Sequence, residues 1–128
     1  MPKSQSRNAE VLACLRVIGR RTDEQRRRES DEVNLAEIDL RGLVLDNLNL
    51  RDTDLREAHL EGATLRNTRL SGAFLLGTHL EGALVASWDL TQEQVDNACG
   101  NAETVLSAHL EKPPGWIRNP PVCRSVEH

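Results

Sequence analysis

Two histidines and two glutamates recur at a fixed spacing and have the side-chain chemistry of a metal site. The segment HLEGA occurs twice, twenty residues apart, and supplies His59, Glu61, His79 and Glu81. Imidazole nitrogens and carboxylate oxygens are ligands that zinc and nickel accept. Whether these side chains form a site depends on the elements that carry them, because a metal needs its ligands within about 2 Å.

Motifs of common catalytic chemistry are absent from the sequence. It contains no HExxH segment, no glycine-rich phosphate loop and no Ser-His-Asp triad motif. We therefore predict no catalytic residue, no cofactor, no small-molecule substrate and no enzymatic activity.

Three cysteines, Cys14, Cys99 and Cys123, stand at spacings that match no metal-binding motif. We expect Cys14 and Cys99 on buried helix faces, where cysteine behaves as a small apolar residue. Free thiols are typical of a reducing compartment, which predicts a cytoplasmic protein. No stretch approaches the roughly 18 apolar residues of a membrane span, and the apolar run at 11–15 is too short for a secretory leader.

A run of three arginines at 26–28 is the most basic feature of the chain. Five acidic residues within the segment 23–32 nearly cancel it, and no aromatic residue lies nearby on which a base could stack. The composition disfavours direct nucleic-acid binding and is typical of a solvated, charged linker.

The elements that position these residues follow from an aliphatic side chain at every fifth position. In an α-helix this period would spread the side chains around the axis, and in a flat strand it would place alternate ones on opposite faces. A chain that turns by a constant angle every five residues points all of them at one axis, which predicts a β-solenoid. The twelve centres, our core ladder, are Leu35, Leu40, Leu45, Leu50, Leu55, Leu60, Leu65, Leu70, Leu75, Leu80, Val85 and Leu90.

The residue two positions before each centre forms a second inward register. Between Thr53 and Ala83 this residue is always Ala or Thr, as a narrow interior requires. The other three positions of each repeat are mostly polar, glycine or charged, which indicates an outer surface. Four bulky residues occupy the inner register at the start: Val33, Ile38, Leu43 and Leu48. We expect them to widen the first coil.

The pattern in TDLREAHLEGATLRNTRLSGAFLLGTHLEG resembles the pentapeptide-repeat family, whose members fold as right-handed, four-sided β-helices. The resemblance covers residues 33–92 and implies four pentapeptides per coil, hence about three coils. Gly42, Gly62 and Gly82 recur at the same twenty-residue interval. Stacked coils would place each such residue above its counterpart at about 4.8 Å.

Short α-helices are expected to cap both ends of the solenoid. Residues 1–32 are predicted to form an N-terminal capping helix, with an apolar stripe in NAEVLACLRVIGRR, and the charged linker. Residues 33–92 form the pentapeptide-repeat β-helix, and residues 93–128 a C-terminal capping helix and a Pro-rich tail.

Trp88 falls on the inner register, where an indole would not fit, so we expect the coil to end there. Thr91 and Gln94 can cap the helix that follows, and Gly100 can end it. We expect three apolar residues to close this end: Val95, Ala98 and Trp116.

On a flat outer face the histidines and glutamates have no enclosed pocket, so we predict a solvated ladder and no metal site. The favoured function is that of a protein-protein interaction or scaffold module, through an unknown protein partner or self-association. Outward apolar residues mark its candidate partner surface. They are Phe74 and Leu76 on one face, and Val44 and Leu84 on another.

Two alternatives stay open. The family resemblance implies that the chain could imitate duplex DNA and bind DNA gyrase or topoisomerase, as in quinolone resistance. Duplex DNA carries one charge per about 1.7 Å, and a net charge of −4 over three coils imitates it poorly. The other alternative is the soluble end of a larger membrane-associated assembly.

Overall fold

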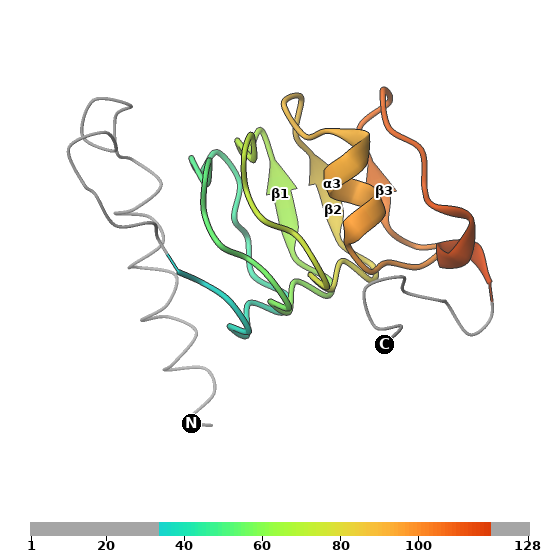
Figure 1. Ribbon diagram of the computed structural model, residues 1–128, viewed down its shortest axis with the longest axis horizontal. Coiled ribbons are helices and arrows are strands. Elements are labelled where there is room, and N and C mark those ends of the chain that lie inside the picture. Colours follow the sequence, from blue (N-terminus) through green and yellow to red (C-terminus); the bar gives the residue numbers. More distant parts are fainter. Residues whose placement is uncertain (1–33, 119–128) are drawn as a thin grey trace.

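The computed structural model describes residues 34–118. Its elements are strand β1 (Thr64–Arg66), strand β2 (Leu84–Ala86), helix α3 (Gln92–Asn97), strand β3 (Val105–Leu106) and a short 3₁₀ helix, η1 (Pro114–Ile117) (Figure 1). The predictions made for 1–33 and 119–128 lie outside the described residues. They concern the N-terminal helix, the linker with its arginine run, Val33, Cys14, Cys123 and the end of the Pro-rich tail.

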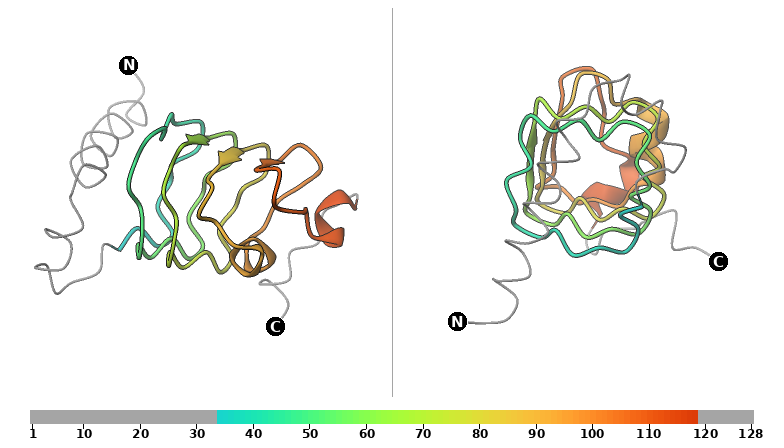
Figure 2. Two further views of the ribbon diagram at one scale, coloured as in Figure 1. Left: turned by 90° about the horizontal axis from the view of Figure 1, so that it is seen from above. Right: turned by 90° about the vertical axis from the view of Figure 1, so that its left-hand side faces the viewer.

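Successive turns of the chain stack on one another in parallel, twenty residues apart. Strands β1 and β2 pair Thr64 with Leu84 and Arg66 with Ala86. Isolated parallel bridges repeat the same offset on the other sides: Asn34–Asp54, Asp39–His59, Val44–Thr64, Asn49–Arg69, Asp54–Phe74, His59–His79 and His79–Cys99. Viewed along the stack, the turns enclose one common interior (Figure 2). This register makes the fold a β-solenoid.

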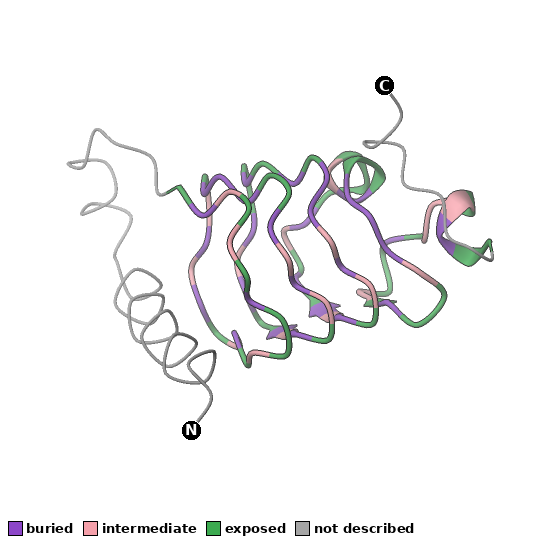
Figure 3. Ribbon diagram, turned by 90° about the horizontal axis from the view of Figure 1, so that it is seen from below, coloured by how far each residue is buried: buried purple, intermediate pink, exposed green. Residues whose placement is uncertain are grey.

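The interior holds the two inward registers of each repeat. All twelve residues of the core ladder are buried, as are Ala58, Ala63, Ala73 and Ala83. Buried and exposed segments recur at corresponding places in successive turns (Figure 3). The inward threonines are satisfied by the preceding turn, since Thr68 Oγ1 donates to Leu45 O over 2.8 Å and Thr78 Oγ1 to Leu55 O over 2.6 Å. A small hydroxyl therefore fits this core without leaving an unpaired polar group.

From Leu35 to Leu80, each repeat turns its corner with one residue in the left-handed region. The residue two positions after every centre from Leu35 to Leu80 has φ between 55° and 74°. Half of these corner residues are glycines, which adopt this conformation without steric cost, and the others are Asn, Asp or Glu. At Gly62 the corner is closed by the Ala63 N–H, which donates to Leu60 O over 3.0 Å. This requirement explains why Gly or Asn recurs at fixed intervals.

The expectation for Trp88 was wrong. The side chain is 68% exposed, and Ser87 is buried in its place. From Leu84 to Trp88 the chain alternates outward and inward, because the interior accepts a serine and not an indole. The corner follows at Trp88 and Asp89, where the Leu90 N–H donates to Ser87 O over 3.4 Å. Ser87 Oγ donates to Asp89 Oδ1, 2.9 Å away, and the same oxygen accepts the Leu70 N–H.

Parallel pairing continues beyond residue 92. Strand β3 pairs with β2 at an offset of twenty-one residues, since Leu84 lies opposite Val105 and Val85 opposite Leu106. Thr104 is buried, and its Oγ1 donates to Leu80 O over 2.8 Å, as the inward threonines of earlier turns do. Residues 99–106 thus add to the same stack.

Helix α3 begins at the residues that the sequence indicated. Thr91 is the N-cap, and its hydroxyl accepts the Gln94 N–H while Gln94 Oε1 accepts the Thr91 N–H over 2.9 Å. The end of the helix differs from the expectation, because α3 stops at Asn97 with Ala98 as the C-cap. Gly100 has another role: it lies directly against the Trp116 ring.

The Gln94 side chain also joins α3 to the preceding turn. Its Nε2 donates to Leu70 O over 2.8 Å and to Ala73 O over 2.9 Å. These carbonyls would otherwise need donors from a further strand. One amide group therefore serves the helix and the coil together.

Trp116 of η1 packs onto the same end of the stack. It is buried with Val95 and Ala98, and its Nε1 donates to Ala98 O over 3.3 Å. Within residues 34–118, no helix is long and apolar enough to cross a membrane.

The expectation of a free thiol at Cys99 was also wrong. Cys99 is disulfide-bonded, and it lies in a parallel bridge with His79 after the end of α3 instead of on a helix face.

We expect Gln94→Glu to destabilise the protein by about 2 kcal/mol or more. Glutamate keeps the acceptor for Thr91 but presents a carboxylate oxygen to the carbonyls of Leu70 and Ala73. Gln94→Ala should cost about 1 kcal/mol through the lost cap. Urea unfolding followed by circular dichroism measures both. Glu93→Gln, an exposed change in the same helix, should stay within about 0.5 kcal/mol of wild type, and a Gln94→Glu protein as stable as wild type would contradict the assignment.

Gly100→Ala should destabilise the protein by about 1–3 kcal/mol, because a Cβ at this position would overlap the Trp116 ring. Displacement of the ring into water should also shift tryptophan emission to longer wavelength. Ala102→Ser, at an exposed position two residues on, should change neither property. Unchanged emission and stability in Gly100→Ala would refute this packing.

Candidate functional site

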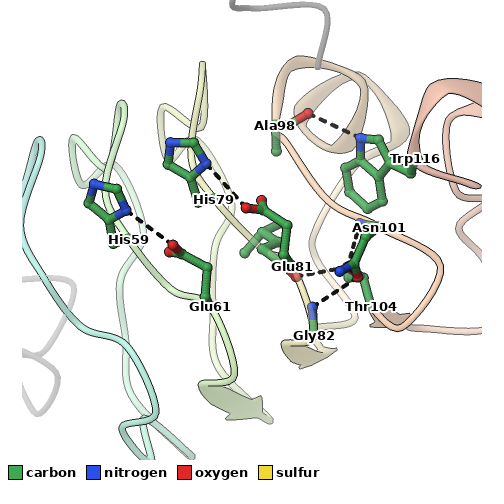
Figure 4. A network of polar contacts seen from close by, with 10 residues as sticks. His59, Glu61, His79, Glu81, Gly82, Ala98, Asn101, Thr104 and Trp116 are labelled. Atoms are coloured by element: carbon green, nitrogen blue, oxygen red, sulfur yellow. Dashed lines mark hydrogen bonds and ion pairs between the residues drawn. The ribbon is translucent and has the colours of Figure 1, made fainter. Parts of the chain in front are cut away.

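The histidines and glutamates of the two HLEGA segments lie on one outer side of consecutive turns (Figure 4). The imidazole rings of His59 and His79 stack with centroids 4.7 Å apart and planes 7° from parallel. His59 Nδ1 lies 3.3 Å from Glu61 Oε2, and His79 Nδ1 lies 3.4 Å from Glu81 Oε2. The turn therefore pairs each histidine with the glutamate two residues on, and the stack repeats the pair.

This geometry gives two lateral pairs and brings no third ligand to a common point. Across residues 34–118, no group of three or more His, Cys, Asp and Glu side chains is placed to hold a metal ion. The Glu61 Oε1 and Glu81 Oε1 atoms are buried without a hydrogen-bond partner among the described residues. Each carboxylate thus has one oxygen close to an imidazole nitrogen and one buried oxygen without a partner among the described residues.

An ion pair continues this side of the coil one turn earlier. Arg41 forms a fork with Asp39, with Nε to Oδ1 and Nη2 to Oδ2 both at 2.9 Å. Hydrogen bonding from Arg41 lowers the pKa of Asp39 to about 2. One turn later Asn101 Oδ1 accepts the Gly82 N–H over 3.1 Å, so the last member of the column is neutral (Figure 4).

The adjoining side carries the first candidate partner surface. Phe74 is 47% exposed and Leu76 50% exposed. The Arg56 guanidinium lies 6.0 Å from the centroid of the Phe74 ring and also binds Asp54, with Nη2 to Oδ2 at 2.7 Å. Hydrogen bonding from Arg56 holds the pKa of the nearly buried Asp54 carboxyl below its ordinary value. The arginine is fixed by Asp54 and leaves the two apolar side chains accessible.

The outer face of the sheet carries the second surface. Bridges and strand pairing align Val44, Thr64, Leu84 and Val105 in one column. Val44 is 53% exposed and Val105 54% exposed, while Leu84 is partly covered. Val44 and Leu84 therefore share a face, separated by Thr64.

Three exposed apolar residues were missed by the sequence analysis: Trp88, Val105 and Ile117. Val105 and Ile117 follow the point at which the coil was expected to end, so no register was assigned to them. Trp88 could have been placed correctly, since the small Ser87 beside it is the better occupant of a narrow core.

Carbon-detected NMR titration should give a pKa of about 2 for Asp39. Arg41→Gln should return the Asp39 pKa toward its ordinary value of about 3.9. A carboxyl whose pKa is lowered on folding stabilises the fold above the unfolded-state pKa, and this contribution is lost as the pH falls from about 4 to about 2. The effect on stability should be small because both side chains are exposed. An Asp39 pKa that is the same in Arg41→Gln as in the wild type would contradict the pairing of Asp39 with Arg41.

Comparison with protein families gives an independent assignment. The model for pentapeptide repeats matches this chain with eight copies, over residues 34–72 and 49–84. A search of curated proteins and a search of solved structures each gave no match. The matched residues are those whose turns stack at the twenty-residue offset. Residues 34–84 are therefore pentapeptide repeats.

Proposed function

We propose that the protein is a non-enzymatic interaction or scaffold module that binds a protein partner or a second copy of itself. The observation that carries this proposal is that large apolar side chains are exposed on the outer faces of the coil. The polar side chains beside them form ion pairs with each other. Phe74 and Leu76 are about half exposed beside an arginine that is already bound to Asp54. Exposed apolar groups of this kind are typical of interaction sites.

The finer architecture belongs to the same proposal. We infer a right-handed, four-sided β-helix of about three coils over 33–92, with an N-terminal cap formed by 1–32. Residues 99–106 extend the parallel stack, so we assign the C-terminal cap to α3 and η1 and not to all of 93–128. The left-handed residue after every centre from Leu35 to Leu80 supports a constant turn angle. The burial of Val95, Ala98 and Trp116 supports closure of the C-terminal end.

Imitation of DNA, with binding to gyrase or topoisomerase, is the weaker candidate. Two carboxylates of the outer surface are paired with arginines of the chain: Asp39 binds Arg41 and Asp54 binds Arg56. Paired carboxylates present less net negative charge than a phosphate backbone. Membership in a membrane-associated assembly has no observation of its own to favour it.

The cytoplasmic location inferred from the sequence rested on free thiols. The disulfide at Cys99 removes that argument, because disulfides are rare in reducing compartments. The binding proposal does not depend on the compartment.

Sedimentation velocity tests the surface around Phe74. We expect concentration-dependent self-association of the wild type, and Phe74→Asp should weaken it about tenfold or more, because the charge would have to be desolvated in an apolar contact. Ser71→Asp, an equally charged change at another exposed position, should have no effect. Wild type and Phe74→Asp that are both monomeric at about 100 µM would exclude this face as a self-association surface.

A further inference from the structure

The outer edge of β3 carries backbone groups that face away from the stack. The strands of the sheet follow the order β1, β2, β3, so within residues 34–118 β3 has a partner strand on one side only (Figure 1). The Val105 N–H donates to Ala83 O over 2.9 Å, toward the preceding turn. Because the N–H and carbonyl groups of successive residues in a strand point to opposite sides, the Leu106 N–H and the Thr104 carbonyl point away from it. Neither group has a hydrogen-bond partner among the described residues.

The side chains at this edge are apolar and incompletely covered. Val105 points outward and is 54% exposed, in the column that also contains Leu84. Leu106 packs against the core but is only partly buried, although all twelve residues of the core ladder are buried. A further strand would bond to the free N–H and carbonyl and would cover both side chains. An open edge of this kind is a site of strand addition.

The chain that follows β3 stays beside the preceding turn. Four hydrogen bonds join side chains or backbone groups of residues 107–116 to residues that lie 18 to 20 positions earlier. They link Ser107 Oγ with Ser87 O, His109 Nε2 with Leu90 O, Glu111 N with Gln92 Oε1 and Trp116 Nε1 with Ala98 O, over 2.9 to 3.3 Å. In the preceding turn the chain leads from Ala98 to β3. Continuation at the same intervals would bring residues 123–126 to the open edge of β3.

The edge sets two requirements for the segment that occupies it. In a parallel strand added to β3, the residue beside Val105 must donate its N–H to Thr104 O and accept the Leu106 N–H with its carbonyl. The next residue along must point inward over Leu106, so it must be apolar. Strand β2 meets the same two requirements above β1, where Leu84 lies beside Thr64 and Val85 points inward above Leu65.

The sequence after residue 118 meets both requirements in one register. Intervals of 18 and 19 would turn Arg124 and Ser125 inward, where neither fits an apolar position. An interval of 20 turns Val126 inward and places Ser125 beside β3, and it is the interval that relates the earlier turns. Val122 cannot take the inward position, because Pro121 before it has no N–H to donate.

We propose that residues 125–127 add to the solenoid as its next parallel strand, on the open edge of β3. The Ser125 N–H donates to Thr104 O, the Leu106 N–H donates to Ser125 O, and the Val126 side chain covers Leu106. Attachment to the same chain gives this segment a high effective concentration at the edge, which favours it over a strand from a separate molecule. The contact is distinct from the Phe74 surface and does not depend on the proposed binding function.

Hydrogen exchange of the Leu106 amide tests this pairing, measured by NMR on the full chain with the Cys99 disulfide intact. We expect exchange about tenfold or more slower than that of an unstructured amide. Val126→Asp should return it to the unstructured rate, because the carboxylate would have to enter the apolar interior. The Leu84 amide, which donates to Ala63 O inside the stack, should exchange at the wild-type rate in every variant and so report that the fold is intact.

Val122→Asp is the matched control. It introduces the same charge into the same segment, at a position whose counterpart twenty residues earlier, Ala102, is exposed. It should leave exchange at Leu106 unchanged. A Leu106 amide that exchanges at the unstructured rate in the wild type would overturn the inference, as would equal effects of the two substitutions or no effect of Val126→Asp. Protection that falls when the protein is diluted about tenfold would also overturn it, and would assign the edge to a second copy of the chain.

Discussion

Hydrogen bonding between backbones twenty residues apart is the constraint on which the rest of the molecule depends. The Leu40 N–H donates to His59 O, and the His59 N–H donates in turn to Ile38 O, both over 2.8 Å. The same exchange recurs on the other sides of the coil, so each turn fixes the height and the rotation of the next. A residue can therefore contact only its counterparts and their neighbours in the adjoining turns. On each outer face, side chains at corresponding positions of successive turns form a column.

This constraint treats the inside and the outside differently. Inside, a column admits only what fits the width set by the leucines, which is why Thr78 is accepted with its hydroxyl bonded to Leu55 O while Trp88 is turned out. Outside, the column imposes proximity without regard to chemistry. It stacks the rings of His59 and His79 and places Phe74 next to Asp54, and the side chains then find local partners.

The interior and the start of α3 could be predicted because both depend on short-range rules. The five-residue period predicts which side chains face inward. The pair of Thr91 and Gln94, a capping box, predicts where the helix begins. The later departures depend on contacts between distant segments. Gly100 leaves room for the Trp116 ring and does not end the helix. No local sequence pattern reveals this contact. The partner of the Cys99 sulfur likewise depends on the three-dimensional path of the chain.

The side chain of Gln94 has a consequence for how the molecule behaves in a crowded solution. A stack of parallel turns is an open template, and its final carbonyls invite another chain to add on as the next layer. The amide of Gln94 donates to the carbonyls of Leu70 and Ala73, and the indole of Trp116 covers Gly100. On the side of the coil that α3 covers, the addition of another strand is thereby prevented by the amide group of Gln94.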